Sequence, residues 1–167
     1  NDILPKLGIT VKLVDSNDPQ NFASAIDEKT RAVFCESVSN PALEIVDLEA
    51  AAKVAHDAGI PLIVDSTFST PYLTQPIAHG ADIVVHSLTK WFGGHGTGLG
   101  GIVVDSGRFK WNTGKHPLFD EPDTSYHGLR WGHDLPAELA PLAFILRMRT
   151  VPLRNLGACI APDNSWM

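Results

Sequence analysis

The chain has 167 residues, of which 44% are hydrophobic, and this is enough for one ordinary domain with a substantial core. Its net charge of −6, from 13 basic and 19 acidic residues, argues against nucleic acid as the main partner. Its uncharged apolar stretches reach only about eight residues, far short of the roughly 20 that span a bilayer, and its two cysteines, Cys35 and Cys159, favour a reducing cytosol.

The first two thirds of the chain alternate between predicted strands and predicted helices. A short helix is expected over residues 21–27. Asp47 is a suitable N-cap for a helix of about a dozen residues, and Gly59 fits the position just after its end. Short apolar or alternating runs predict the strands. These strands are expected at residues 9–14, 32–36, 60–65, 82–86 and 100–105.

The last third is less regular. Residues 107–134 are rich in proline, glycine and aromatic residues, and they predict a long irregular excursion at a surface or interface. Residues 136–148 have helical spacing, although Pro141 predicts a late start or a kink. A further helix is expected over residues 151–158. The alternation upstream predicts an α/β fold with a mostly parallel sheet flanked by helices.

A lysine and an aspartate follow two of the predicted buried strands. Asp65 ends the strand at 60–65, and Lys90 comes shortly after the strand at 82–86. Ligands of open parallel sheets bind outside the carboxyl ends of the strands, so both side chains are expected in one cleft. A lysine after a strand is usually a solvated loop residue, and the pair could be a plain ion pair. Alternatively, a desolvated Lys90 could capture the aldehyde of pyridoxal phosphate while Asp65 keeps the pyridine nitrogen protonated.

Other polar residues extend this candidate site. The hydroxyls of Ser87 and Thr89 lie just before Lys90 and could bind a phosphate. Asn40 begins an Asn-Pro pair, which is normally just a turn. Because it follows a predicted strand, however, it lies on the same edge of the sheet as Asp65, and a contact to a ring-shaped ligand is plausible.

Two other patterns carry little weight. The glycines at 96, 98 and 101 formally match G-x-G-x-x-G, but a strand rather than a helix is predicted directly after them, which argues against a dinucleotide site. The seven histidines show no zinc-binding spacing, and no metal site is expected. His95, which lies among the glycines, is expected to make a structural hydrogen bond.

Three motifs together resemble the Cys/Met-metabolism family of pyridoxal-phosphate enzymes, in both order and spacing. The resemblance extends over essentially the whole chain. Gly-His-Gly-Thr at residues 94–97 is similar to the O-acetylhomoserine sulfhydrylase branch, whereas cystathionine synthases and lyases usually carry Gly-His-Ser-Asp there. The motifs are residues 36–41 (Glu-Ser-Val-Ser-Asn-Pro), 64–72 (Val-Asp-Ser-Thr-Phe-Ser-Thr-Pro-Tyr) and 86–96 (His-Ser-Leu-Thr-Lys-Trp-Phe-Gly-Gly-His-Gly).

The resemblance implies a role for each residue of the candidate site. Lys90 would hold the cofactor, pyridoxal 5′-phosphate, covalently and would act as the catalytic base. Asp65 would pair with the pyridinium nitrogen. Ser87 and Thr89 would bind the phosphate group. Asn40 would touch the ring near its 3′-oxygen.

The resemblance also implies a place in a larger enzyme. Residues 1–150 would be part of the large domain of a fold-type-I transferase, and residues 151–167 would start the connection to a C-terminal domain. The chain begins without methionine and stops without a closing element, so it is expected to be a fragment. The family's stacking tyrosine, its glycine-rich phosphate-binding helix start and its substrate-gripping arginine are missing from it.

The implied activity is a γ-replacement in methionine biosynthesis by a cytoplasmic homotetramer. O-acetyl-L-homoserine and sulfide would give L-homocysteine and acetate. A cystathionine γ-synthase or γ-lyase of the same family is an alternative. An inactive fragment or interaction subunit is another, because substrate-binding parts are missing.

Overall fold

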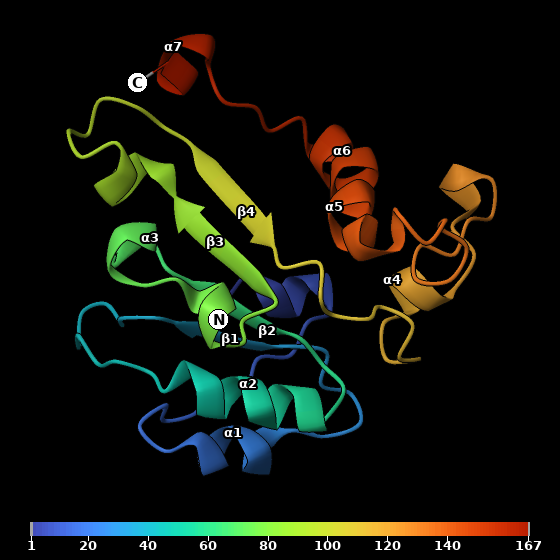
Figure 1. Ribbon diagram of the computed structural model, residues 1–167, viewed down its shortest axis with the longest axis horizontal. Coiled ribbons are helices and arrows are strands. Elements are labelled where there is room, and N and C mark those ends of the chain that lie inside the picture. The colour runs from blue at the N-terminus through green and yellow to red at the C-terminus, as the bar shows by residue number, and fades with distance from the viewer. Residues whose placement is uncertain (1, 167) are drawn as a thin grey trace.

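A computed structural model describes residues 2–166, and its centre is a four-stranded sheet (Figure 1). The strands are β1 (Val33–Glu36), β2 (Leu62–Asp65), β3 (Ile83–Ser87) and β4 (Gly101–Asp105), and they lie side by side in chain order. The β1–β2 and β2–β3 pairs are parallel, and β3–β4 is antiparallel. The predicted α/β fold with a mostly parallel sheet is therefore confirmed, with β4 as an antiparallel edge strand.

One face of the sheet is covered by α1 (Pro19–Ala25) and α2 (Leu48–Asp57) (Figure 1). Helix α2 begins at its predicted cap, because Asp47 accepts a hydrogen bond from Ala50 N at 3.0 Å. Gly59 follows the helix with a φ of 68°, a conformation that glycine adopts without steric cost. The buried residues of α2 pack on the strands and are Leu48, Ala51, Ala52 and Ala55.

The opposite face carries a second core that is rich in aromatic residues. Trp111 stacks on Phe119 with ring centroids 4.3 Å apart, and Trp131 is also buried. Residues 107–134 are largely irregular and mostly exposed, as expected, but their buried aromatic side chains supply much of this core. Together with Ala143, Phe144 and Leu146 of the C-terminal helical segment, their aromatic side chains pack against Val85 and Val103, because the strands offer an apolar surface on this face.

One predicted strand is absent. Residues 9–14 are not a strand in the structure, although they alternate in polarity. The sheet begins at β1, which pairs only with β2, so this segment has no neighbouring strand to complete its hydrogen bonds. Ile9 and Leu13 accordingly remain 49% and 79% exposed. Polarity alternation alone does not supply the partner that a strand needs.

The helices that remain are short. Pro141 delays the last longer helix as predicted, because a 3-10 turn at Ala140–Leu142 precedes α5 (Ala143–Met148). The predicted helix over 151–158 is found as a continuation of α5. The other helical segments are η1 (Leu4–Leu7), α3 (Thr70–Leu73), η2 (Pro76–His79), η3 (Leu88–Phe92), α4 (Pro117–Asp120), η4 (Thr124–Tyr126), η6 (Arg149–Leu153), α6 (Arg154–Leu156) and α7 (Pro162–Trp166).

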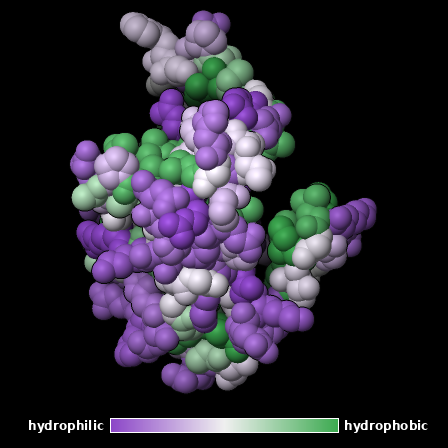
Figure 2. Space-filling view, turned by 90° about the vertical axis from the view of Figure 1, so that its right-hand side faces the viewer, coloured by the Kyte–Doolittle hydropathy of each residue, from purple (hydrophilic) through white to green (hydrophobic). Residues whose placement is uncertain are grey.

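The surface is mainly hydrophilic on the face shown in Figure 2, with hydrophobic residues gathered in separate patches. Within residues 2–166, no helix combines the length and the apolar character that crossing a membrane requires. Cys35 is buried, and this burial raises the pKa of its thiol to about 12. The thiol therefore stays protonated and unreactive.

Candidate active site

The carboxyl ends of β1, β2 and β3 bring the predicted site residues to one edge of the sheet. Glu36 lies opposite Asp65 in the parallel register, and Asp65 lies opposite Val85, two residues before Ser87. Because side chains alternate along a strand, these residues share one face. Val64, the neighbour of Asp65, faces the core beneath α1 and α2 instead. The last acidic or hydroxyl side chains of the three strands thus converge, as the sequence predicted.

Asp65 is half-buried at the end of β2, and its carboxylate is only partly used within the protein. Its Oδ1 accepts a hydrogen bond from Thr67 N at 2.9 Å, which fixes the side chain against its own backbone. No ion pair joins Asp65 to Lys90 within residues 2–166. The plain ion pair that the sequence left open is not formed, and Oδ2 is available to a ligand.

Lys90 lies in the π-helical turn η3, immediately after β3. Its φ of −92° and ψ of −116° depart from helical values. Gly93 N donates to Leu88 O and Gly94 N donates to Lys90 O, both at 2.9 Å, so the turn is closed by backbone hydrogen bonds. The amine is exposed rather than desolvated at the end of a strand, so that part of the expectation was wrong. The turn, not the strand, presents the lysine.

The two predicted phosphate ligands are in different situations. Ser87 ends β3, and its side-chain hydroxyl forms no hydrogen bond within the described part of the chain. The hydroxyl of Thr89 accepts from Gly100 N at 3.1 Å and donates to Gly100 O at 3.3 Å. A hydroxyl has one proton, so Thr89 would have to release this carbonyl before donating to a phosphate.

Asn40 is exposed in the loop that follows β1, on the same edge of the sheet. Its backbone N donates to Glu36 Oε2 at 2.8 Å, and its peptide bond to Pro41 is cis. Glu36 therefore anchors the turn that presents Asn40. The structure brings Asn40 to the expected edge, and its contact with a ring ligand stays a prediction.

Beneath this edge, three buried serines form a closed triangle of hydroxyls. Ser37 Oγ lies 3.0 Å from both Ser66 Oγ and Ser69 Oγ, and the last two are 2.8 Å apart. Each hydroxyl can donate one hydrogen bond and accept another, so the triangle is internally satisfied. It joins the loops that follow β1 and β2.

Substituting Ser66 of this triangle by alanine should therefore destabilise the fold. Ser66→Ala leaves two buried hydroxyls each short of a partner, and we expect the free energy of unfolding to fall by about 1–3 kcal/mol. Urea denaturation measures this. Ser24→Ala is the control, because its exposed hydroxyl bonds only to Gln20 O within α1, and it should change stability by less than about 0.5 kcal/mol. Equal effects of the two substitutions would contradict the importance of the triangle.

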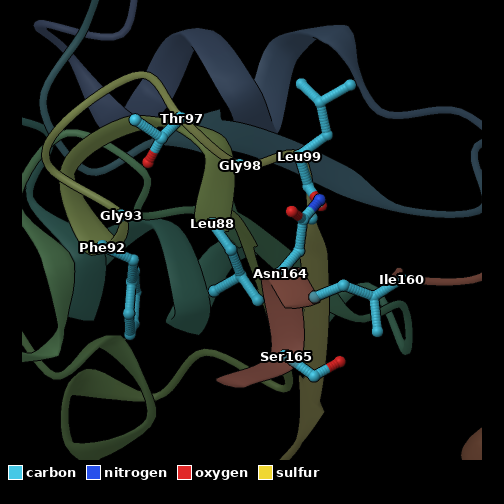
Figure 3. A pocket seen from close by; sticks show the side chains of 10 residues that line it. Leu88, Phe92, Gly93, Thr97, Gly98, Leu99, Ile160, Asn164 and Ser165 are labelled. Carbon is cyan, nitrogen blue, oxygen red and sulfur yellow. The ribbon is translucent and has the colours of Figure 1, made fainter. Parts of the chain in front are cut away.

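A pocket of about 350 Å³ lies beside the lysine turn (Figure 3). Leu88 and Phe92 of the turn line it together with the glycine-rich loop, and residues from α7 complete its wall. Asn164 Nδ2 donates to Leu99 O at 2.9 Å and holds α7 against this loop. Lys90, Asp65 and Ser87 do not line the pocket, so it neighbours the candidate site but is separate from its polar groups.

His95 behaves as expected, since its Nδ1 donates to Gly93 O at 3.0 Å within the glycine-rich loop. Two further residues of the edge were missed from the sequence. Glu36 was noted only as the end of a strand, although it anchors Asn40. Thr67 was not singled out, although the pattern Asp-x-Thr favours a turn in which the aspartate caps the backbone two residues later.

The geometry can be compared with known proteins. All 167 residues match the family model described as Cys/Met metabolism PLP-dependent enzyme. The chain belongs to this family. Its match extends through every strand of the sheet and through both loops that carry Asp65 and Lys90.

Individual members of the Cys/Met metabolism family agree with this assignment. The chain is 51% identical over 166 residues to an O-acetyl-L-homoserine sulfhydrylase from Leptospira meyeri, covering 97% of this chain and 38% of that protein. It is 49% identical over 162 residues to a homocysteine synthase from Schizosaccharomyces pombe, covering 95% and 37%. The chain thus spans less than two fifths of the length of these curated relatives.

A solved structure is similar over nearly the whole chain. It comes from Campylobacter jejuni, is assigned as an O-acetylhomoserine (thiol)-lyase and is described with N′-pyridoxyl-lysine-5′-monophosphate. The TM-score is 0.88 at 39% identity, covering 98% of this chain and 40% of that one. The two proteins therefore share a fold over nearly all of this chain.

The donor set of this edge fits pyridoxal phosphate. The cofactor needs an amine for its aldehyde, a carboxylate for its ring nitrogen and hydrogen-bond donors for its phosphate. Lys90 would supply the amine, Asp65 its carboxylate oxygen Oδ2, and Ser87 a hydroxyl. None of these three groups is used by another side chain in the part of the chain that the structure describes.

Proposed function

We propose that this chain supplies the lysine-bearing part of an O-acetylhomoserine sulfhydrylase that uses pyridoxal 5′-phosphate. The carrying observation is that Asp65 and Ser87 end two neighbouring parallel strands and that Lys90 lies in the turn directly after Ser87, without an ion pair between the acid and the amine in the described residues. The relatives named above support the substrate, O-acetyl-L-homoserine, and the product, L-homocysteine.

Within this proposal, each residue has one task. Lys90 binds the cofactor covalently. Asp65 holds the proton on the pyridine nitrogen. Ser87 and Thr89 donate to the phosphate, and Asn40 lies near the 3′-oxygen. Residues 1–150 belong to the cofactor-binding domain, and residues 151–167 start a connecting segment.

The bound cofactor supplies an electron sink for the carbanion at the substrate Cα. Asp65 sustains that sink, because a carboxylate beside the ring nitrogen favours its protonated, positively charged form. Lys90 would hold the cofactor and, once its Nζ is free, would act as a base next to Cα. Nζ would move along the substrate, taking the Cα proton and returning protons as acetate leaves Cγ and sulfide adds there. The exposed turn η3 gives Lys90 room for this movement.

The test of this proposal is the choice of sulfur donor by the holoenzyme of the full-length protein. We expect acetate release and homocysteine formation from O-acetylhomoserine with sulfide, measured by mass spectrometry of the products. Faster turnover with cysteine, giving cystathionine, would assign the protein to the cystathionine γ-synthase reaction instead. Failure to bind pyridoxal phosphate would favour a non-catalytic subunit.

The same proposal includes a cytoplasmic homotetramer. The two free cysteines, of which Cys35 is buried and unreactive, suit a reducing compartment. Large apolar side chains near the site, such as Tyr72 at 93% and Trp91 at 60% exposure, suit burial against other protein surface. Light scattering of the full-length protein measures the oligomeric state.

A further inference from the structure

Thr67 joins the two halves of the candidate site. Its backbone N donates to Asp65 Oδ1 at 2.9 Å, and its side-chain Oγ1 accepts from Ser87 N at 2.8 Å. One residue therefore touches both the acid at the end of β2 and the last residue of β3. Neither bond involves the groups that the proposed function leaves to the cofactor, which are Asp65 Oδ2 and the Ser87 hydroxyl.

The position of Thr67 explains why a side-chain hydroxyl, and not a backbone carbonyl, accepts the hydrogen bond from Ser87 N. The parallel ladder between β2 and β3 continues to Ser66, whose N donates to Val85 O. The next acceptor in such a ladder would be a backbone carbonyl, but the chain turns away after Ser66 toward α3. The Thr67 hydroxyl takes the place of that carbonyl for Ser87 N, a half-buried group that would otherwise be unpaired.

We propose that Thr67 is a positioning residue. Its two hydrogen bonds fix the position of Asp65, which would bind the ring nitrogen of the cofactor, relative to Ser87, which would bind the phosphate. This inference rests on the proposed function and deepens it. The distance between Asp65 and the segment from Ser87 to Lys90 must match the fixed length of one pyridoxal phosphate molecule, and Thr67 is the hydrogen-bonded bridge between them. Without the Thr67 hydroxyl, the end of β3 can shift relative to Asp65, whose hydrogen bond from Thr67 N is kept.

The sharpest test compares Thr67→Ser with Thr67→Ala in the full-length holoenzyme, because these two variants differ by a single oxygen atom. The dissociation constant of pyridoxal phosphate is measured by removing the cofactor and titrating it back, following its visible absorbance. We expect affinity within about twofold of the wild type for Thr67→Ser and about five- to twentyfold weaker for Thr67→Ala. Thr67→Val, which keeps the shape of threonine, should behave like Thr67→Ala.

A second readout separates positioning from simple loss of stability. The Tm is measured with and without cofactor, and the gap between the two reports binding to the folded state. We expect this gap to shrink in Thr67→Ala and Thr67→Val and to be kept in Thr67→Ser. Thr150→Val is the matched control, because its hydroxyl bonds only to helical carbonyls such as Leu146 O at 2.8 Å, and its gap should equal that of the wild type.

Two results would overturn the inference. One is a Thr67→Ala enzyme whose Tm falls equally with and without cofactor while its affinity is unchanged. The other is a Thr67→Ser enzyme as weak in binding as Thr67→Ala. If the wild type itself yields no pyridoxyl group on Lys90 after borohydride reduction, the proposed function fails, and the inference fails with it. Failure of the proposed function can therefore be distinguished from failure of the inference about Thr67.

Discussion

Lys90→Ala is expected to abolish both turnover and covalent capture of the cofactor. Lys90 is the only lysine in the turn η3, whose backbone hydrogen bonds hold its position after β3. The loss removes the covalent attachment and the general base together, so turnover should fall by more than about 10³-fold. Acetate release from O-acetylhomoserine measures the rate.

The covalent part of this prediction has its own measurement. Borohydride reduces the bond between a lysine and pyridoxal phosphate, and peptide mass spectrometry then locates the pyridoxyl group. We expect the label on Lys90 in the wild type and no label in Lys90→Ala. Lys29→Ala is the control, since Lys29 is an exposed lysine in the loop before β1, and it should label and turn over like the wild type. Labelling of another lysine in the Lys90→Ala enzyme would refute the assignment.

Asp65 and Lys90 could be placed at one sheet edge from the sequence, because the strands that they end or follow are marked by continuous apolar runs. Parallel strands then bring their carboxyl ends to one edge whatever their detailed register. Residues 9–14 show the limit of the same reasoning. Their alternation describes the chain alone, whereas a strand needs a neighbour, and no described strand lies beside them.

Side-chain hydrogen bonds were harder to foresee. The bond from Ser87 N to Thr67 Oγ1 depends on the β2–β3 register and on the turn after Ser66, neither of which is written in local composition. The Thr89 hydroxyl illustrates the opposite case. Its place in the sequence predicts a phosphate ligand. However, the antiparallel pairing of β4 with β3 brings Gly100 next to Thr89, and Gly100 N donates a hydrogen bond to the Thr89 hydroxyl. Contacts between segments far apart in the chain therefore determine the hydrogen bonds of the Thr67 and Thr89 hydroxyls.

Asp65→Asn is expected to leave the fold intact and to weaken both cofactor binding and turnover. Asparagine has the same shape, and its side-chain oxygen can still accept the hydrogen bond from Thr67 N, so the Tm without cofactor should change by only a few degrees. The amide, however, carries no charge to hold a proton on the pyridine nitrogen. By analogy with buried ion pairs that lose one partner, the loss should be roughly 3–5 kcal/mol, shared between affinity and rate.

Glu36→Gln is the control variant for Asp65→Asn. Glu36 lies directly opposite Asp65 in the sheet and is a second carboxylate at the same edge. If negative charge anywhere at the edge were sufficient, both substitutions would weaken the enzyme alike. Because Glu36 Oε2 is already engaged by Asn40 N, we expect Glu36→Gln to cost much less affinity than Asp65→Asn. A titration of pyridoxal phosphate into the two variants measures the difference, and equal losses would show that Asp65 has no special contact with the ring.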